Sequence, residues 1–336
     1  MPKPWKETQH MSTSSTVSKL VRQLALATVL TAPFLGSGLA HAAGNVTFTA
    51  EQSYPEGIAW SPAQKVFFVS SVHTGVVGKV TPDGRYTVFI QDEKIISSVG
   101  LQFDARRNLL WVAIGDVGAS TRSSPATQGK LAALAAYDAT TGERRAYHDL
   151  GSLVEGGGGH FANDMALDAA GNVYVTDSFA PVVYRIDTRG VATVFARDDV
   201  FKGEGFNLNG IVYHPDGYLL VGKYNSGEIF RISTTKNAGA VHRVKLSAPI
   251  AGADGMVLRS RDRISVVQNL GADQVLDVVS KDGWQSASLL PAGKSAQSFP
   301  TSGVLVGKDL YVLNAQLDTL FSKEAAKVST YLLQKF

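Results

Sequence analysis

The hydrophobic positions of the chain fall in short runs of Val, Ile, Tyr and Phe that are separated by polar turn sequences. Pro-Asp-Gly, Ala-Gly-Asn and Thr-Gly stand between the runs, and little of the chain has the 3.6-residue periodicity of a helix. The stretch GFNLNGIVYHPDGYLLVGKYNSGEIFRI contains three such runs, at residues 211–213, 218–221 and 228–232. This pattern predicts an all-β fold made of short strands and tight turns.

The same order of strands and turns recurs along the chain. PEGIAWSPAQKVFFVSSVHTGVVGKVTPDGRYTVF and FANDMALDAAGNVYVTDSFAPVVYRIDTRGVATVF follow one plan, and four further segments repeat it. The copies begin at Pro55, Ser98, Phe161, Leu208, Gly252 and Pro300. Six copies in residues 43–336 give about 49 residues each, close to the length of one four-stranded propeller blade.

These repeats predict a single domain, a six-bladed β-propeller, over residues 43–336. Radial repetition leaves only short, protected strand edges. A two-sheet sandwich is the alternative, but it does not explain a repeated unit with one fixed strand order. Residues 45–52 are expected to complete the last blade, and residues 328–333 are a candidate last strand. The insertions at residues 115–130 and 151–161 are expected on the binding face, with 115–130 as a candidate lid.

One residue of each repeat stands directly before the first strand. The first strand of every blade lines the centre of a propeller, so we expect these six axial positions to converge. They are Glu56, Val99, Asn163, Asn209, Asp254 and Ser302. Four of them carry carboxylate or amide oxygens, namely Glu56, Asn163, Asn209 and Asp254, and these predict a metal site in a central channel.

Two carboxylates in an apolar channel repel each other and lose hydration unless a cation or hydrogen bonds compensate. An all-oxygen set with two negative charges suits one hard divalent cation, Ca²⁺ first, with Mg²⁺ or Mn²⁺ as alternatives. Zn²⁺ is less suited, because the set contains no His or Cys. The alternative is that each polar residue only hydrogen-bonds its own turn.

Further polar residues follow the second strand of the repeats: His73, Asp116, Asp177, Lys223, Asn225, Asn269 and Asn314. Asp177 is a candidate substrate-binding residue, with a turn cap as the alternative. His160 follows four glycines and is a candidate catalytic acid or base near neutral pH, although a solvated surface histidine is the commoner case.

Aromatic residues near the axial positions are candidates for the walls of a substrate pocket. Phe161 and Phe206 are the candidate substrate-binding residues of this kind, together with Tyr224, although each could equally belong to the core. Asp164 directly follows Asn163 and is positioned to orient it.

The first 42 residues have the features of an export signal. Lys19 and Arg22 precede an apolar run at residues 24–39, which ends in the small-x-small sequence Ala40-His41-Ala42. An uncleaved N-terminal anchor is the alternative. We expect residues 1–42 to be a signal peptide, and the mature protein to be periplasmic or secreted without membrane contact.

Charge and cysteine content exclude several classes of protein. Residues 1–42 hold four of the 32 basic residues and one of the 29 acidic residues, so the remainder has 28 of each. A neutral mature domain gives no electrostatic case for binding nucleic acid or anionic membranes. The chain has no cysteine, which excludes disulfides, thiol nucleophiles and Cys-ligated zinc.

Four motifs surround the polar axial residues: PEGIAW at Glu56, FANDMALDAAGNVYVTD at Asn163, NGIVYHPDG at Asn209 and GADGMVL at Asp254. Together they resemble the family of gluconolactonase, regucalcin (senescence marker protein) and luciferin-regenerating enzyme, which are six-bladed, calcium-dependent propellers. The resemblance covers nearly the whole mature chain and depends on the order and spacing of the motifs. It implies that Glu56, Asn209 and Asp254 hold a divalent metal. Asn163 would contact substrate or complete the metal shell, as in the similar paraoxonase propellers, and Asp254 would also be the general base.

One position departs from the family pattern. The sugar-lactone enzymes carry an Arg two residues before the asparagine of the third blade, and here that position is Phe161. A guanidinium suited to sugar hydroxyls or a carboxylate is therefore replaced by an apolar ring. This change indicates a less polar lactone or ester as the substrate.

The expected activity is metal-assisted hydrolysis of a small-molecule lactone or related ester. The cation would polarise the carbonyl group and Asp254 would activate a water molecule. No Gly-x-Ser-x-Gly sequence supports a serine mechanism, and no phosphate-binding fingerprint is present. Two alternatives remain: a metal-free enzyme similar to strictosidine synthase, and a non-catalytic propeller that serves as a binding scaffold.

Overall fold

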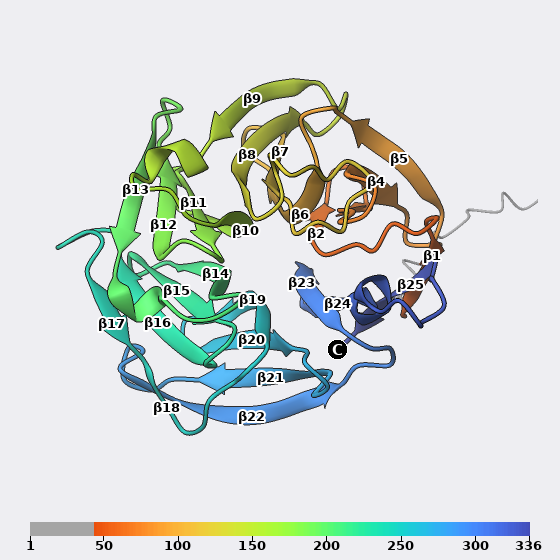
Figure 1. The fold of residues 1–336 in the computed structure, drawn as a ribbon. Coiled ribbons are helices and arrows are strands. Elements are labelled where there is room, and N and C mark those ends of the chain that lie inside the picture. The colour runs from red at the N-terminus through yellow and green to blue at the C-terminus, as the bar shows by residue number, and fades with distance from the viewer. Residues whose placement is uncertain (1–43) are drawn as a thin grey trace, which may run out of the picture. The chain divides into compact units, whose positions relative to one another are not determined.

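The sheets of the protein have a propeller-like arrangement around a common centre, as Figure 1 shows for the computed structural model, which describes residues 44–336. The predicted signal peptide lies outside these residues. From the centre outward, the first sheet contains β2 (Ile58–Ser61), β3 (Val66–Val69), β4 (Val76–Val80) and β5 (Tyr86–Gln91). No helix within residues 44–336 is long and apolar enough to cross a membrane.

The second sheet has eight strands, because two neighbouring antiparallel units are joined by a short parallel contact. The first unit contains β6 (Ser97–Asp104), β7 (Leu109–Gly115), β8 (Lys130–Asp138) and β9 (Arg144–Asp149). The second contains β10 (His160–Leu167), β11 (Val173–Asp177), β12 (Val182–Ile186) and β13 (Ala192–Arg197). The parallel contact pairs His160 and Phe161 of β10 with Lys130 and Leu131 of β8.

Three further sheets complete the described part of the chain. The third contains β14 (Leu208–His214), β15 (Tyr218–Lys223), β16 (Glu228–Ser233) and β17 (Val241–Arg243). The fourth contains β18 (Lys245–Leu246), β19 (Ala253–Ser260), β20 (Arg263–Gln268), β21 (Gln274–Val279) and β22 (Ser286–Lys294). The fifth contains β23 (Pro300–Val306), β24 (Asp309–Asn314), β25 (Thr330–Lys335) and β1 (Val46–Thr49). Hydrogen bonding thus divides the described strands into five sheets, not into the six separate blades expected from the repeats.

The second strands of the sheets are more buried than the outer strands. Every residue of β3 and β11 is buried, because these strands are covered by neighbouring sheets on both faces. Phe68 of the first sheet packs in one cluster with Val112 and Tyr137 of the second. The outer strands β5 and β22 expose much of their length to solvent. The all-β prediction is confirmed for residues 44–336, where one short helix, α1 (Leu317–Phe321), and two 3₁₀ turns, Gly151–Leu153 and Asp199–Phe201, are the exceptions.

The N-terminal strand closes the last sheet, as the sequence predicted. β1 pairs antiparallel with β25, with Val46 opposite Leu333 and Thr49 opposite Thr330. The predicted strand at residues 328–333 is observed as β25, at Thr330–Lys335. The innermost strands contact one another in the cyclic order β2, β6, β10, β14, β19, β23 and back to β2. Side chains at the ends of these six strands therefore share one central space.

Candidate functional site

A repeated β-bulge turns the axial residues toward the centre. In five inner strands the pairing with the second strand skips two residues at the same place. The skipped pairs are Val99-Gly100, Asn163-Asp164, Asn209-Gly210, Asp254-Gly255 and Thr301-Ser302. A bulge re-aims side chains relative to the regular pleat and is common beside active sites. Glu56 and Gly57 lie directly before β2 and have the corresponding place in the first sheet.

The register of the last sheet corrects one axial prediction. The residue equivalent to Asn209 is Thr301, and Ser302 takes the place of the following glycine. Thr301 is fully buried, and its hydroxyl donates a 2.7 Å hydrogen bond to the backbone oxygen of Glu56. Ser302 instead lines a cavity at the other end of the ring.

The axial backbones touch each other around the ring, which explains the glycines that follow them. A Cβ atom on Gly57 would collide with the carbonyl oxygen of Val99, and one on Gly100 with that of Asn163. Gly210 and Gly255 have the same relation to the next strand in the cycle. Only a residue without a side chain allows such a close backbone approach. The four polar axial side chains therefore project from neighbouring positions of one narrow ring.

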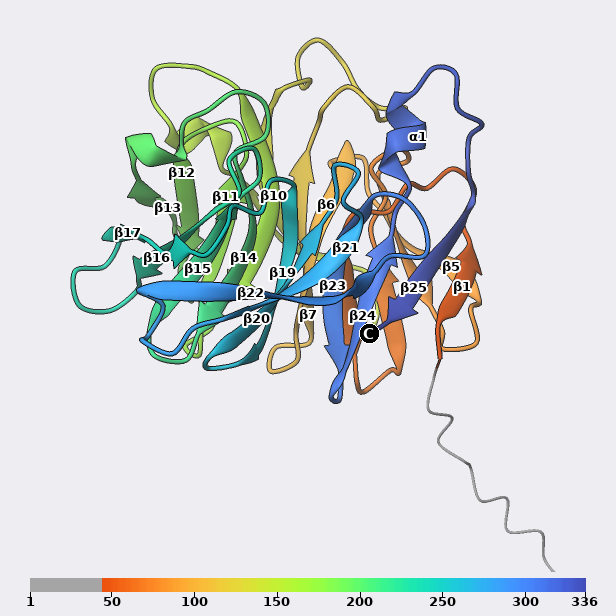
Figure 2. The same cartoon turned by 90° about the horizontal axis from the view of Figure 1, so that it is seen from below.

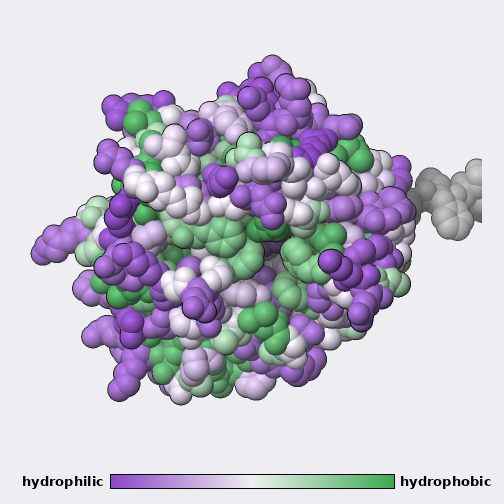
Figure 3. All heavy atoms as spheres, in the orientation of Figure 1, coloured by the Kyte–Doolittle hydropathy of each residue, from purple (hydrophilic) through white to green (hydrophobic). Residues whose placement is uncertain are grey.

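These side chains line one cavity of about 80 Å³, and Leu317 and Phe321 of α1 belong to the same lining, so the cavity lies on the side of the ring that carries α1. Figure 2 shows α1 and the longer loops together on this side, and Figure 3 shows a central hollow with hydrophobic residues around part of its rim. The polar lining consists of Glu56, Asn163, Asn209 and Asp254, together with Tyr224. The rest of the lining is apolar: Val72, Val99, Val117, Phe161, Phe206, Phe299, Leu317 and Phe321.

Each of the four polar axial residues presents one buried oxygen that has no hydrogen-bond partner. The atoms are Glu56 Oε2, Asn163 Oδ1, Asn209 Oδ1 and Asp254 Oδ1. A buried acceptor without a partner costs about 1–3 kcal/mol, so four in one cavity of a native protein call for an explanation. The prediction that these residues converge is met by the geometry, and the alternative in which each one only satisfies its own turn does not account for these oxygens.

The partners of the remaining polar atoms fix the direction of the free oxygens. The Asn163 side-chain nitrogen donates to Ser178 Oγ at 2.9 Å, so the oxygen of the same amide faces the cavity. The Asn269 side-chain nitrogen donates to Asp254 Oδ2 at 2.6 Å, and Tyr224 donates its hydroxyl to Asn269 Oδ1 at 2.7 Å. Asn269 thus positions Asp254, a role that the sequence did not reveal, although Asn269 belongs to the polar set after the second strands.

Burial and mutual repulsion raise the pKa values of the carboxyl groups at the site. Burial raises the pKa of Asp254 to about 8, with a smaller contribution from Asp164, while hydrogen bonds from Asn269 and Asn209 oppose the shift. The pKa of Glu56 lies well above its usual value because of burial and the nearby Asp254 and Asp164. A cation among these groups would compensate the same repulsion and favour their charged forms.

The donor set fits a hard cation. No group of three His, Cys, Asp or Glu side chains within residues 44–336 is arranged to hold a metal, so a site here depends on the two amide oxygens as well as the two carboxylates. Oxygen-only sets that mix carboxylates, amides and waters are typical of Ca²⁺, and less so of Zn²⁺. The four unpartnered oxygens are the atoms that such an ion would use.

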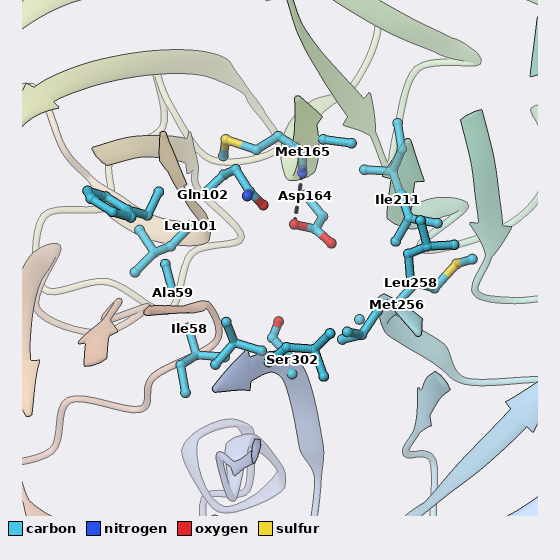
Figure 4. A pocket seen from close by; sticks show the side chains of 18 of the residues that line it. Ile58, Ala59, Leu101, Gln102, Asp164, Met165, Ile211, Met256, Leu258 and Ser302 are labelled. Carbon is cyan, nitrogen blue, oxygen red and sulfur yellow. Dashed lines mark hydrogen bonds between the residues drawn. The ribbon is translucent and has the colours of Figure 1, made fainter. Parts of the chain in front are cut away.

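Asp164 lies on the other side of the ring from this cavity. It is the charged residue of a second cavity of about 330 Å³, in which Ile58, Leu101 and Ile211 are among the apolar neighbours (Figure 4). Its Oδ1 accepts a 2.8 Å hydrogen bond from the Met165 backbone nitrogen, and burial raises its pKa to about 7. Asp164 therefore acts on the axial carboxylates through its charge, and no hydrogen bond from it to Asn163 supports the predicted orienting role.

His160 and Asp177 form a buried pair behind the cavity wall and do not line the cavity. His160 Nδ1 lies 2.9 Å from Asp177 Oδ2, which also accepts from the Tyr184 hydroxyl at 2.8 Å. Asp177 Oδ1 accepts from the backbone nitrogens of Phe161, Phe179 and Ala180, each at 2.9 Å. This arrangement matches the turn-cap alternative for Asp177. His160 is 7% exposed, so it is not the solvated histidine that the glycine run suggested.

The predicted aromatic wall is present and extends further than expected. Phe161 and Phe206 line the cavity with ring centroids 5.6 Å apart, and Tyr224 lies 6.2 Å from Phe206. Phe161 fits against β7 because residue 115 is glycine, where a Cβ atom would meet its ring at 2.5 Å. The insertion at residues 115–130 contributes Val117 to the lining, and the helix α1 was not anticipated.

Comparisons with known proteins support the fold. No protein-family model and no curated protein matches the sequence. Among solved structures, the chain is similar to the major allergen Mala s 1 of Malassezia sympodialis, with 16% identity, a TM-score of 0.69, and coverage of 87% of this chain and 95% of that one. It is also similar to a gluconolactonase of Xanthomonas campestris, with 16% identity, a TM-score of 0.59, and coverage of 87% and 89%. A luciferin-regenerating enzyme gives 14% identity, a TM-score of 0.59, and coverage of 87% and 95%. Identities this low establish the propeller-like fold alone, and the neighbours include both enzymes and an allergen.

Proposed function

We propose that the protein is an exported, metal-dependent hydrolase of a lactone or related ester. In this proposal the fold is a six-bladed propeller whose eight-stranded sheet contains two blades, β6–β9 and β10–β13. The observation that carries the proposal is the set of four buried, unpartnered oxygens in one cavity, two from carboxylates and two from amides. The similarity in fold to a gluconolactonase and a luciferin-regenerating enzyme is consistent with a hydrolase.

Glu56, Asn163, Asn209 and Asp254 would hold the cation, Ca²⁺ first, with Mg²⁺ or Mn²⁺ as alternatives. When bound, a divalent cation supplies Lewis acidity toward the ester carbonyl and stabilises the negative charge that develops on its oxygen. With the cation bound, Glu56 and Asp254 would be ionised and would provide two negative charges in a cavity with apolar walls, where such electrostatic effects are stronger than in water.

Asp254 is the group best placed to handle a proton. Its Oδ1 faces the cavity without a partner, while Asn269 holds its Oδ2. In the ionised form, the Asp254 carboxylate could accept a proton from a water molecule that attacks the carbonyl carbon, through an oxygen that the cation does not occupy, and could then return the proton to the departing alcohol oxygen, provided that the water lies within hydrogen-bond reach. His160 is turned toward Asp177 and lies outside the cavity lining, so we assign it no part in the proton transfer.

The apolar walls determine which substrates can enter. Phe161 stands where the sugar-lactone enzymes that the sequence resembles carry an Arg, and the Asn163 amide nitrogen is already engaged by Ser178. Few donors remain for the hydroxyl groups of a sugar lactone. We therefore propose a substrate less polar than an aldonolactone.

A panel of lactones and aryl esters tests the proposed activity. The protein without residues 1–42 is stripped of metal and then refilled with Ca²⁺, Mg²⁺, Mn²⁺ or Zn²⁺, and hydrolysis is followed by pH-stat titration. We expect turnover to disappear on stripping and to return with Ca²⁺, and Asp254→Asn to remove it. Glu143→Gln, at a side chain that is 64% exposed, is the control that should leave turnover unchanged.

A non-catalytic binding scaffold is the second candidate, since the structural neighbour Mala s 1 is described as an allergen and not as an enzyme. In that case the cation stabilises the ring without supporting turnover. A gain in melting temperature with Ca²⁺, together with no hydrolysis of any substrate under any ion, would favour the scaffold. Export is tested separately by the N-terminal mass of the protein recovered outside the cytoplasm, which should begin at Ala43.

A further inference from the structure

We propose that the natural substrate carries an apolar chain of several carbons, which lies along a wall formed by Phe206, Phe299, Leu317 and Phe321. This inference rests on the proposed function, because it assigns the ester or lactone group of the same molecule to the axial oxygens. It goes further by naming an amphiphilic substrate class and a residue, Phe321, that selects for it.

The cavity has a polar end and an apolar end. The four axial oxygens lie on one side, and the rest of the lining comes from Val, Leu and Phe side chains, with Tyr224 as the exception. The Tyr224 hydroxyl donates to Asn269, so it is not free to donate to a substrate hydroxyl. A ligand that complements this lining has a carbonyl group at one end and a hydrocarbon part at the other.

Phe321 extends the apolar wall from the cavity toward solvent. Its side chain is 55% exposed, although it also lines the cavity. The other large hydrophobic residues that are exposed within residues 44–336 lie outside the lining of this cavity: Val88, Val191, Val200, Leu270 and Leu290. An exposed aromatic ring that continues the wall of a pocket is better explained by ligand contact than by chance exposure. The cavity is about 80 Å³, so a lactone ring would fill it and a longer chain would reach Phe321 at the rim.

Hydrogen bonds and packing fix the position of α1, which contributes Leu317 and Phe321 to this wall. Lys327 Nζ donates to the backbone oxygens of Thr319, Leu320 and Ser322, at 2.8, 3.0 and 2.8 Å, around the end of α1. Ser298 Oγ donates to Asp318 at 2.9 Å. Leu317 packs in one cluster with Tyr54, Val72 and Ala315 of the main body. A preorganised wall lowers the entropic cost of binding, so Lys327 is a positioning residue for Phe321.

The length of the substrate's apolar chain provides a direct test of contact with this wall. Burying one methylene group contributes about fourfold in affinity when it is fully covered, and less against a one-sided wall. We therefore expect kcat/KM to rise about two- to fourfold for each added carbon over the first few carbons, from γ-butyrolactone toward γ-decalactone. Phe321→Ala should flatten this rise, so that the ratio of kcat/KM between γ-decalactone and γ-butyrolactone falls several-fold relative to the wild type.

Two further variants identify the origin of the effect. Leu290→Ala removes a comparably exposed side chain, 48% exposed, on the outer strand β22, and it should keep the full chain-length dependence. Lys327→Met releases the carbonyl groups of α1 without touching the cavity lining, and it should weaken the dependence by raising KM for long chains with little change in kcat. An equal loss for short and long chains in Lys327→Met would show a general structural role and would overturn its assignment as a positioning residue.

Binding without turnover separates this inference from the proposed function. Titration calorimetry of the Ca²⁺-loaded protein with 2-alkanones of increasing length, which cannot be hydrolysed, should give the same rise and the same loss in Phe321→Ala. Affinity that rises with the length of the alkyl chain, without hydrolysis of any lactone, would overturn the proposed hydrolase activity and support the proposed apolar wall. Hydrolysis that is independent of chain length, or that favours glucono-δ-lactone, would overturn the wall and leave the hydrolase in place.

Discussion

The axial carboxyl groups make the stability of the protein depend on pH in a way that a bound cation should cancel. Burial holds the folded-state pKa of Asp254 at about 8, against about 4 in an unfolded chain. Below pH 4 both states are protonated at this group, and the folded state bears no penalty. As pH rises above 4, the unfolded chain releases the proton while the folded protein retains it, so the free energy of unfolding falls until the pH passes 8.

The size of the fall in the free energy of unfolding follows from the shift in the pKa of Asp254. Each pH unit within this window costs about 1.4 kcal/mol for one group, so Asp254 alone contributes on the order of 5 kcal/mol between pH 4 and pH 8. A domain of about 290 residues has an unfolding entropy of roughly 0.6 kcal/mol per kelvin, which converts this change into a fall of about 8 °C in melting temperature. Asp164, with a pKa of about 7, and Glu56 act in the same direction.

Differential scanning calorimetry between pH 5 and pH 8 tests this reasoning on the protein without residues 1–42. In EGTA we expect the melting temperature to fall by several degrees from pH 5 to pH 8. Excess Ca²⁺ at about a hundred times its Kd should add about 2.7 kcal/mol, or about 4 °C, at pH 8. The gain at pH 5 should be smaller, because protons compete for the same oxygens.

Asp254→Asn removes one of the titrating groups, so it should reduce the pH dependence in EGTA and abolish most of the Ca²⁺ gain. Glu143→Gln, at an exposed position, should change neither quantity. The reasoning is refuted if the metal-stripped protein becomes more stable from pH 5 to pH 8, or if Ca²⁺ stabilises the wild type and Asp254→Asn equally.

Three further substitutions probe the packing of the site. Gly115→Ala should push the Phe161 ring into the cavity and lower kcat/KM for the preferred ester at least about tenfold, as steady-state kinetics would show. Asn269→Leu leaves Asp254 Oδ2 without its donor, so urea unfolding should show a loss of about 1–3 kcal/mol, and calorimetry a weaker Ca²⁺ affinity. Gly210→Ala forces a Cβ atom onto the Asp254 backbone oxygen, and we expect a loss of 2 kcal/mol or more on the same urea scale.

A matched control exists for the glycine substitutions. A Cβ atom on Gly44 would meet no atom within 4 Å, so Gly44→Ala should leave stability and turnover unchanged. Wild-type kinetics in Gly115→Ala would contradict the contact with Phe161, and wild-type stability in Gly210→Ala would contradict the close approach of neighbouring inner strands. Unchanged Ca²⁺ affinity in Asn269→Leu would show that Asp254 needs no support from Asn269.

The axial residues could be predicted from the sequence because a repeated structural constraint has a repeated sequence pattern. Asn209-Gly210 and Asp254-Gly255 need a polar residue that faces the centre and a glycine that lets the next strand approach. The same reasoning placed the axial residue of the last sheet one position too late in the sequence. Ser302-Gly303 looks like Asn209-Gly210, but the bulge lies at Thr301-Ser302, where a serine takes the place of the glycine. A sequence pattern does not reveal this exchange, because it depends on the local spacing between two strands.

Other parts of the site depend on contacts between segments that are distant in the chain. His160 looked like a surface residue after a glycine run, but the pairing of β10 with β8 and β11 buries it against Asp177. The wall at Phe321 belongs to a helix of five residues, which is too short to show a periodicity. The division into five sheets arises from two paired residues at the start of β10, which no blade repeat would indicate.

The pairing of β1 with β25 also affects the order of folding. The last sheet joins the first described strand, Val46–Thr49, to the last, Thr330–Lys335, so its fourth strand is separated from its partner by nearly the entire domain. At about 5–20 residues per second, synthesis of the intervening chain takes tens of seconds, during which β1 has no partner. The last sheet therefore cannot be completed until residues 330–335 are available, and removal of β25 should leave β1 and the outer edge of β24 unpaired.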